Sequence, residues 1–177
     1  MIGISFNKKE FEYDAYTLVK AFYPQEEVEN FYEEDAEEKK VYDLLVRITY
    51  GEDKTHLSLE RDGEIIFGEA ARFKKGQERK ERKNILKQIL YRGLVQETGI
   101  TLPWGNLTGI RPTKIAMGLI ESGMSNAEAA DYMRRTYYTG NAKTALAVTI
   151  ANRERDLLKD IDYQNGYSLY VGIPFCP

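Results

Sequence analysis

The chain has 177 residues, of which 42% are hydrophobic and 30% charged, and its formal net charge is −3. This length allows one domain or two small ones with a buried core. No apolar run approaches the roughly 20 residues of a membrane helix, and the first residues lack the pattern of a secretory signal. The single cysteine, Cys176, cannot form an internal disulfide, which fits a reducing compartment, so we expect a cytoplasmic protein.

Charge divides the chain into two halves. Residues 1–71 carry 8 Lys and Arg against 18 Asp and Glu, a balance of −10, whereas residues 72–177 have a balance of +7. Such asymmetry is typical of structural units with different surfaces. We therefore expect an acidic α/β subdomain over residues 1–71 and a basic helical subdomain over residues 72–163, which makes the fold class α+β.

The acidic half is expected to form a small β-meander with a helix packed on it. Residues 14–23 place apolar side chains on one helical face, and Pro24 ends the helix. Other segments are rich in β-branched residues or alternate apolar with polar residues, and turn residues separate them. These strand candidates are residues 2–6, 40–50, 55–60 and 65–67.

Two features of the acidic half carry side chains that bind cations in other proteins. His56 is the only histidine, and no second His or neighbouring Cys completes a zinc site with it. The acidic run at residues 33–38 lacks the glycine and the alternating oxygen ligands of an EF-hand loop. A half-exposed strand residue and a solvated loop are the simpler interpretations, so we assign no metal site here.

The basic half is expected to begin with an amphipathic helix over residues 74–97, where apolar residues recur at helical spacing until Gly99. Its first turns are strongly basic, which suits phosphate, nucleic acid or a polycarboxylate, or simply a solvated helix face. No aromatic residues are interleaved to stack bases, which disfavours single-stranded nucleic acid. The cations are Lys74, Lys75, Arg79, Lys80, Arg82 and Lys83.

Three shorter helices are expected to follow. Pro112 begins the first, and Gly123 ends it. Ser125 begins the second with a capping box, and Asn141 can cap the third, which we extend to Lys159. A helix-turn-helix around Gly123 is the alternative, but acidic residues early in its second helix disfavour DNA readout.

Residues 102–114 join the long helix to this cluster and contain the only Trp, two Gly and two Pro. Arg111 and Lys114 lie near the expected start of a helix, where free backbone amides also favour anions. The segment therefore suits an anionic ligand. Alternatively, Gly and Pro shape a turn, Trp104 fills the core and Arg111 pairs with an acid.

The last ten residues, 168–177, predict a strand. Alternation places Leu169 on an apolar face and Tyr170 and Gly172 on the other. In an α/β barrel the apolar face would meet the outer helices. Cys176, just past the strand, would then stand at the mouth, where such barrels keep their chemistry.

Residues 170–177 (Tyr-Val-Gly-Ile-Pro-Phe-Cys-Pro) resemble the opening of the radical S-adenosylmethionine (SAM) domain of the oxygen-independent coproporphyrinogen III oxidase (dehydrogenase) family. Residues 102–114, with Pro-Trp-Gly and Leu-Thr-Gly-Ile-Arg-Pro-Thr-Lys, are similar to the region upstream of that domain in the HemZ branch. The resemblance covers the basic half and the tail, and the acidic half only by position. It implies that residues 164–177 are the start of a truncated radical SAM barrel.

The resemblance implies a [4Fe–4S] cluster held by three cysteine thiolates, of which Cys176 would be the first. Tyr170 would lie near the cluster and SAM, whereas Gly172 stands where the well-studied branch of the family has a histidine, so that residue's role is missing here. A deoxyadenosyl radical derived from SAM would abstract hydrogen from a propionate of coproporphyrinogen III, and loss of carbon dioxide would leave a vinyl group. The product would be protoporphyrinogen IX, in anaerobic haem biosynthesis.

One thiolate does not hold such a cluster, so we expect the 177-residue chain to be inactive alone, without bound cluster or SAM, as the N-terminal region of a longer enzyme. There it would help to bind or cap an anionic tetrapyrrole through Arg111, Lys114 and the basic helix. The alternatives are a non-catalytic module that docks on the barrel, on an electron donor or on a haem acceptor, and a nucleic-acid-binding module, which the sequence disfavours.

Overall fold

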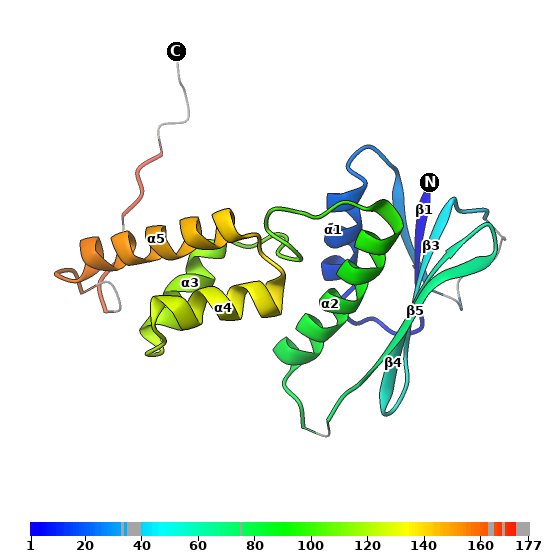
Figure 1. The fold of residues 1–177 in the computed structure, drawn as a ribbon, viewed down its shortest axis with the longest axis horizontal. Helices are drawn as coiled ribbons and strands as arrows, with labels where there is room; N and C mark the ends of the chain where they lie inside the picture. The colour runs from blue at the N-terminus through cyan, green and yellow to red at the C-terminus, as the bar shows by residue number, and fades with distance from the viewer. Residues whose placement is uncertain (33, 35–39, 75, 163–164, 168, 173–177) are drawn as a thin grey trace, which may run out of the picture.

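A five-stranded mixed sheet occupies one end of the molecule, and three helices form the other end (Figure 1). The computed structural model describes residues 1–32, 34, 40–74, 76–162, 165–167 and 169–172. The strand order is β2-β1-β3-β4-β5, with β1 parallel to both of its neighbours and β3, β4 and β5 antiparallel. The strands are β1 (Ile2–Phe6), β2 (Val28–Tyr32), β3 (Leu44–Tyr50), β4 (Lys54–Arg61) and β5 (Glu64–Arg72).

Alternation along the strands decides which face of the sheet is buried. The register of β3 and β4 aligns Val46 with Leu59 and Ile48 with Leu57, and all four side chains are buried. Because side chains alternate between the two faces, a slip of one residue would turn all of them to the opposite face. The hydrophobic pattern therefore fixes the pairing of these strands.

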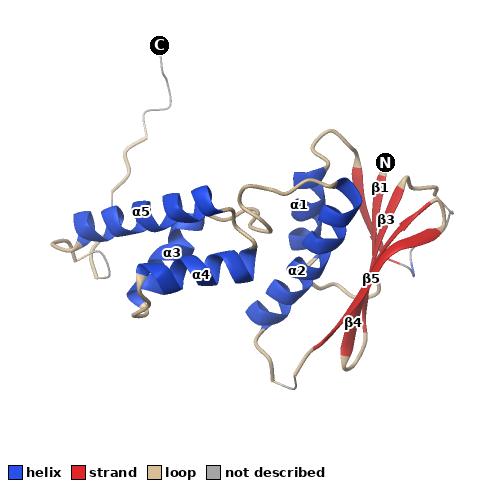
Figure 2. Cartoon of the chain, in the orientation of Figure 1, coloured by secondary structure: helices blue, strands red, loops and turns tan. Residues whose placement is uncertain are grey.

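Two helices cover this buried face of the sheet (Figure 2). The first, α1 (Glu12–Phe22), connects the parallel strands β1 and β2, and the second, α2 (Arg79–Thr98), follows β5. Gly93 brings α2 close to the sheet, since a Cβ there would lie 2.8 Å from the Phe67 ring. Gly99 ends α2 in the left-handed conformation that glycine adopts without strain. Side chains from the sheet, α1 and α2 share one hydrophobic core.

The other end of the molecule consists of α3 (Pro112–Glu121), α4 (Asn126–Tyr137) and α5 (Asn141–Leu158). Their buried core is made mainly of small residues: Ala116, Ile120, Ala129, Met133, Ala147 and Ala151. Small side chains allow the helix axes to approach closely. None of the described helices combines the length and apolar character needed to span a bilayer.

The structure confirms the α+β class and most of the predicted elements. The prediction missed β2, a partly buried strand at the sheet edge whose sequence, Val-Glu-Asn-Phe-Tyr, alternates only weakly. The long helix begins at Arg79 rather than at Lys74. Asn141 was wrongly predicted as a cap, because Gly140 is the N-cap residue of α5 and Asn141 is already helical.

The boundary between the two hydrophobic cores does not coincide with the boundary between the acidic and basic halves of the sequence. Helix α2 belongs to the basic half, yet it packs in the same core as the acidic sheet. The division into subdomains at residues 71 and 163 rests on charge and remains a prediction.

The strand predicted over residues 168–177 does not form over Leu169–Gly172, which the structure places outside any helix or strand. The side chains of Leu169, Tyr170 and Val171 are all largely exposed. A lone strand leaves its backbone amides and carbonyls without partners, so it needs a neighbouring strand to form. The start of a barrel over residues 164–177 therefore remains a prediction, and residues 173–177 lie outside the described part of the chain.

Candidate functional site

The first half of the segment over residues 102–114 is held against the end of α4. The Asn106 amide donates to the Tyr137 carbonyl (2.9 Å), and the Gly140 amide donates to the Pro103 carbonyl (3.1 Å). Gly105 has a φ of 58°, and a Cβ on it would lie 1.9 Å from the Tyr137 carbonyl oxygen. Only glycine fits this position, so the expected turn-forming role of this residue is confirmed.

The second half of the segment is held by its threonine. The Thr108 hydroxyl lies 2.9 Å from the Thr17 hydroxyl of α1 and accepts a hydrogen bond from the Lys87 ammonium of α2 (3.0 Å). Next to it, Gly109 approaches the Tyr13 ring of α1. The Leu-Thr-Gly-Ile-Arg-Pro motif is thereby tied to both helices that cover the sheet.

Lys87 is a buried cation that the sequence analysis did not single out. Its side chain is only 9% exposed, and its nearest carboxylate, Asp14, lies 4.0 Å away. Burial lowers the pKa of Lys87 to about 8, although Asp14 acts in the opposite direction; neighbouring Lys83 lowers the pKa further. Lys87 lies three and seven residues before Leu90 and Leu94, within the apolar stripe of the helix, and that position was the available signal.

Arg111 and Lys114 lie close together at the start of α3, as predicted. Arg111 is the N-cap residue, Pro112 follows it, and both cationic side chains are exposed. Among the described residues neither cation forms an ion pair, so the alternative in which Arg111 pairs with an acid finds no support there. Between them, the Thr113 hydroxyl is buried and has no described hydrogen-bond partner.

Trp104 fills part of the second core, as the structural interpretation of the segment expects. The Lys143 ammonium of α5 lies 5.4 Å from the centre of its ring. The segment therefore combines a structural first half with an exposed cationic second half.

The basic end of α2 is largely engaged with the N-terminal region. Three of its cations contact aromatic rings or carboxylates of the acidic half, which favours a structural role for this patch. The contacts are Arg79 over the Phe11 ring (4.9 Å), Arg82 with Glu10 (2.9 Å) and Lys83 with Asp14 (3.5 Å). Lys74 precedes the helix, and Lys75 lies outside the described residues.

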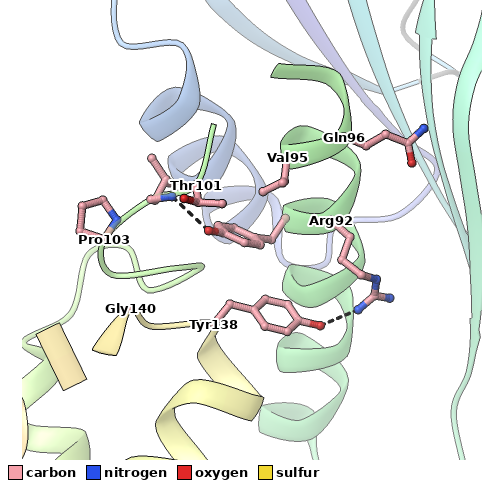
Figure 3. Close-up of a pocket in the computed structure, with 9 residues that line it drawn as sticks. Arg92, Val95, Gln96, Thr101, Pro103, Tyr138 and Gly140 are labelled. Carbon is pink, nitrogen blue, oxygen red and sulfur yellow. Dashed lines mark hydrogen bonds between the residues drawn. The ribbon is translucent and has the colours of Figure 1, made fainter. Parts of the chain in front are cut away.

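A cavity of about 560 Å³ opens where α2 meets the segment that follows it and the turn between α4 and α5 (Figure 3). We call it the α2 groove. Tyr91 of α2 stacks on Tyr138, with ring centres 5.4 Å apart. The sequence analysis named neither tyrosine, because only tertiary packing brings them together. The groove is lined by Tyr91, Arg92, Val95, Gln96, Thr101, Leu102, Pro103, Tyr138 and Gly140.

The remaining candidates do not gather into one site among the described residues. His56 is exposed on the sheet face opposite the helices, and only Glu34 of the predicted acidic run is described. Tyr170 is 91% exposed and Gly172 is also exposed, whereas Cys176 lies outside the described residues. Within the described part of the chain, no group of three potential metal ligands is found.

Comparison with known proteins yields one informative match. The chain is 37% identical, over 99 residues, to the "oxygen-independent coproporphyrinogen-III oxidase-like protein HemZ" of Bacillus subtilis (strain 168). The match covers 55% of this chain and 20% of that protein, so the chain spans about a fifth of its relative's length. No model of a known family matches, and no solved structure matches significantly. The match confirms the resemblance to HemZ that the sequence motifs indicated.

The cofactors implied by the resemblance do not fit the residues of this chain alone. An iron–sulfur cluster of this kind requires three thiolates, and the sequence contains a single cysteine. These 177 residues alone therefore do not supply the ligands for such a cluster.

Proposed function

We propose that this chain, a relative of the HemZ protein, is the N-terminal accessory region of a radical SAM enzyme that acts on coproporphyrinogen III. The complete enzyme would decarboxylate two propionates oxidatively to give protoporphyrinogen IX. The observation that carries the proposal is the 37% identity to HemZ, which is named as an oxidase-like protein. The motif over residues 170–177, which contains Cys176, supports the assignment to radical SAM chemistry.

Within that enzyme, Arg111 and Lys114 would contact carboxylates of the substrate. Both side chains are exposed and have no described acidic partner, so their charge is available to an anion. The Thr113 hydroxyl, which lies between them in the sequence, is buried and has no described hydrogen-bond partner. The contacts of Thr108 with α1 and α2 hold the preceding residues in place.

The enzymatic part is tested with the longest natural polypeptide that contains this sequence. It would be reconstituted anaerobically with iron and sulfide, then supplied with SAM, a reductant and coproporphyrinogen III. We expect protoporphyrinogen to form, and the 177-residue chain in parallel to form none and to retain no stoichiometric iron. Absence of product from a polypeptide that holds a full cluster would overturn the substrate assignment.

The role of the cations is tested on the chain itself. Coproporphyrin III, the stable oxidised relative of the substrate, would be titrated while its fluorescence is followed. Arg111→Ala and Lys114→Ala should each weaken binding severalfold. Arg153→Ala, which removes an exposed cation of α5, should leave binding unchanged. Equal weakening by all three variants would indicate non-specific attraction and contradict the assigned contacts.

A further inference from the structure

The α2 groove has an apolar interior formed by residues distant in sequence. The rings of Tyr91 and Tyr138 stack at an angle of 27°, and Val95, Leu102 and Pro103 complete the apolar lining. Flat aromatic surfaces favour flat ligands, because offset stacking adds to the energy of apolar burial. The size of the cavity, about 560 Å³, is within the range of small-molecule sites.

One end of the groove carries a pair of hydrogen-bond donors. Arg92 donates from Nη1 to the Tyr138 hydroxyl (2.7 Å; Figure 3). Glu69 accepts from Nε (3.2 Å) and Nη2 of the same guanidinium. Nη1 and the Tyr138 hydroxyl each retain a hydrogen that the described residues do not use. Because the two donor atoms are 2.7 Å apart, they match the spacing of the two oxygens of one carboxylate.

The charge at this end selects for a singly charged group. Glu69 already pairs with Arg92 through two hydrogen bonds, so a phosphate dianion would be repelled by the Glu69 carboxylate. A monocarboxylate gains two charge-assisted hydrogen bonds at a smaller electrostatic cost.

Tyr91 provides a second polar point within the groove. It is only 6% exposed, and its hydroxyl oxygen accepts a hydrogen bond from the Leu102 amide (3.0 Å). The hydroxyl hydrogen has no described acceptor, and a buried donor without an acceptor is costly. A ligand oxygen near this hydroxyl would remove that cost.

We propose that the α2 groove binds a flat, largely apolar monocarboxylate. Its ring system lies against Tyr91 and Tyr138, and its carboxylate accepts hydrogen bonds from Arg92 and Tyr138. This site is separate from Arg111 and Lys114 and does not depend on the proposed enzymatic function.

Pyrenebutyrate is a fluorescent probe of this chemical class, and titration into the 177-residue chain tests the proposal. We expect saturable binding of one molecule per chain, about tenfold tighter than that of the uncharged pyrenebutanol, because the carboxylate makes charge-assisted hydrogen bonds. Tyr138→Phe, which keeps the stacked ring but removes the hydroxyl, should weaken pyrenebutyrate severalfold and leave pyrenebutanol unchanged.

A blocking variant locates the bound probe. Thr101 lines the groove and is exposed, so Thr101→Trp should occupy the groove and abolish binding without disturbing the core. Thr49→Trp, on the sheet face opposite the helices, is the matched control and should bind normally. Circular dichroism would establish that both variants fold. Normal binding by Thr101→Trp, equal affinity for the two probes, or no saturable binding would each overturn the proposal.

Discussion

The two ends of the molecule are held together in different ways. The core shared by the sheet, α1 and α2 is built from large side chains, including Phe6, Leu59 and Leu90, that are fully buried. In the hydrophobic core of the helical cluster, by contrast, four of the six buried side chains are alanines. Because hydrophobic stabilisation grows with the apolar area buried, the sheet end should contribute most of the stability.

Polar contacts join the cluster to the sheet end. The Gln88 side chain of α2 donates to the Thr136 carbonyl near the end of α4 (2.9 Å). The Pro103–Asn106 turn forms hydrogen bonds with Tyr137 and Gly140 at and just after the end of α4. Lys87 contacts Thr108. The position of the cluster, and with it that of Arg111, therefore depends on a few hydrogen bonds, on the turns and on the stacking of Tyr138 on Tyr91.

The largest expected effect is that of Leu90→Ala at the sheet end. Leu90 is fully buried, so its truncation should lower the free energy of unfolding by about 2–5 kcal/mol. Ile120→Ala makes a comparable truncation in the small core, where Ile120 is 7% exposed, and should cost less. Urea unfolding of both variants checks this, and a greater loss from Ile120→Ala would reverse the comparison.

Gly105→Ala should break the connection between the two ends. A left-handed conformation costs an alanine about 1–2 kcal/mol, and the clash with the Tyr137 carbonyl adds to that cost. Gly109→Ala is the control, because its φ of 66° is similar but its Cβ would make only ordinary contacts. Thermal unfolding should show a clearly lower midpoint for Gly105→Ala. Equal shifts in the two variants would mean that the clash is relieved without cost.

Lys87→Met should remove a pH dependence of the free energy of unfolding that arises where the two ends meet. Folding lowers the pKa of Lys87 from 10.5 to about 8, so between these values the unfolded chain binds more protons than the folded one. The free energy of unfolding of the wild type should therefore rise with pH across this window, by at most about 1.4 kcal/mol per pH unit relative to the variant. Asp14 and Lys83 remain in both proteins, so the difference between the two profiles from urea unfolding reports on Lys87. Parallel profiles would contradict its perturbed pKa.

The sequence predicted those helix boundaries that are marked by residues at the boundary itself. The capping box at Ser125 and the glycine after α2 are both present as expected. By contrast, β2 owes its existence to pairing with β1, and its own sequence is only weakly strand-like. A strand whose formation depends on a distant partner is poorly marked in its own residues.

The candidate sites also fall into two kinds, those formed by neighbours in the sequence and those formed by tertiary packing. Arg111 and Lys114 are neighbours along the chain, so the sequence sufficed to place them together. The bond from Lys87 to Thr108 and the stacking of Tyr91 on Tyr138 join separate elements. These contacts are set by the packing of α2 against the turns, which no local pattern encodes.

Ser125→Ala has the smallest expected effect, and it tests whether the two ends unfold independently. The Ser125 hydroxyl accepts from the Glu128 amide, and the Glu128 carboxylate accepts from the Ser125 amide (2.8 Å). Loss of this cap should cost about 1 kcal/mol, whereas Ser122→Ala, at the end of α3, should cost less because it removes no N-cap. Hydrogen exchange distinguishes the outcomes by location. If the helical cluster opens separately, the amides of α4 should exchange about fivefold faster while those of β3 and β4 stay unchanged. Faster exchange throughout the chain would mean that one cooperative unit includes both cores, and the weaker core would then be stabilised by the stronger one.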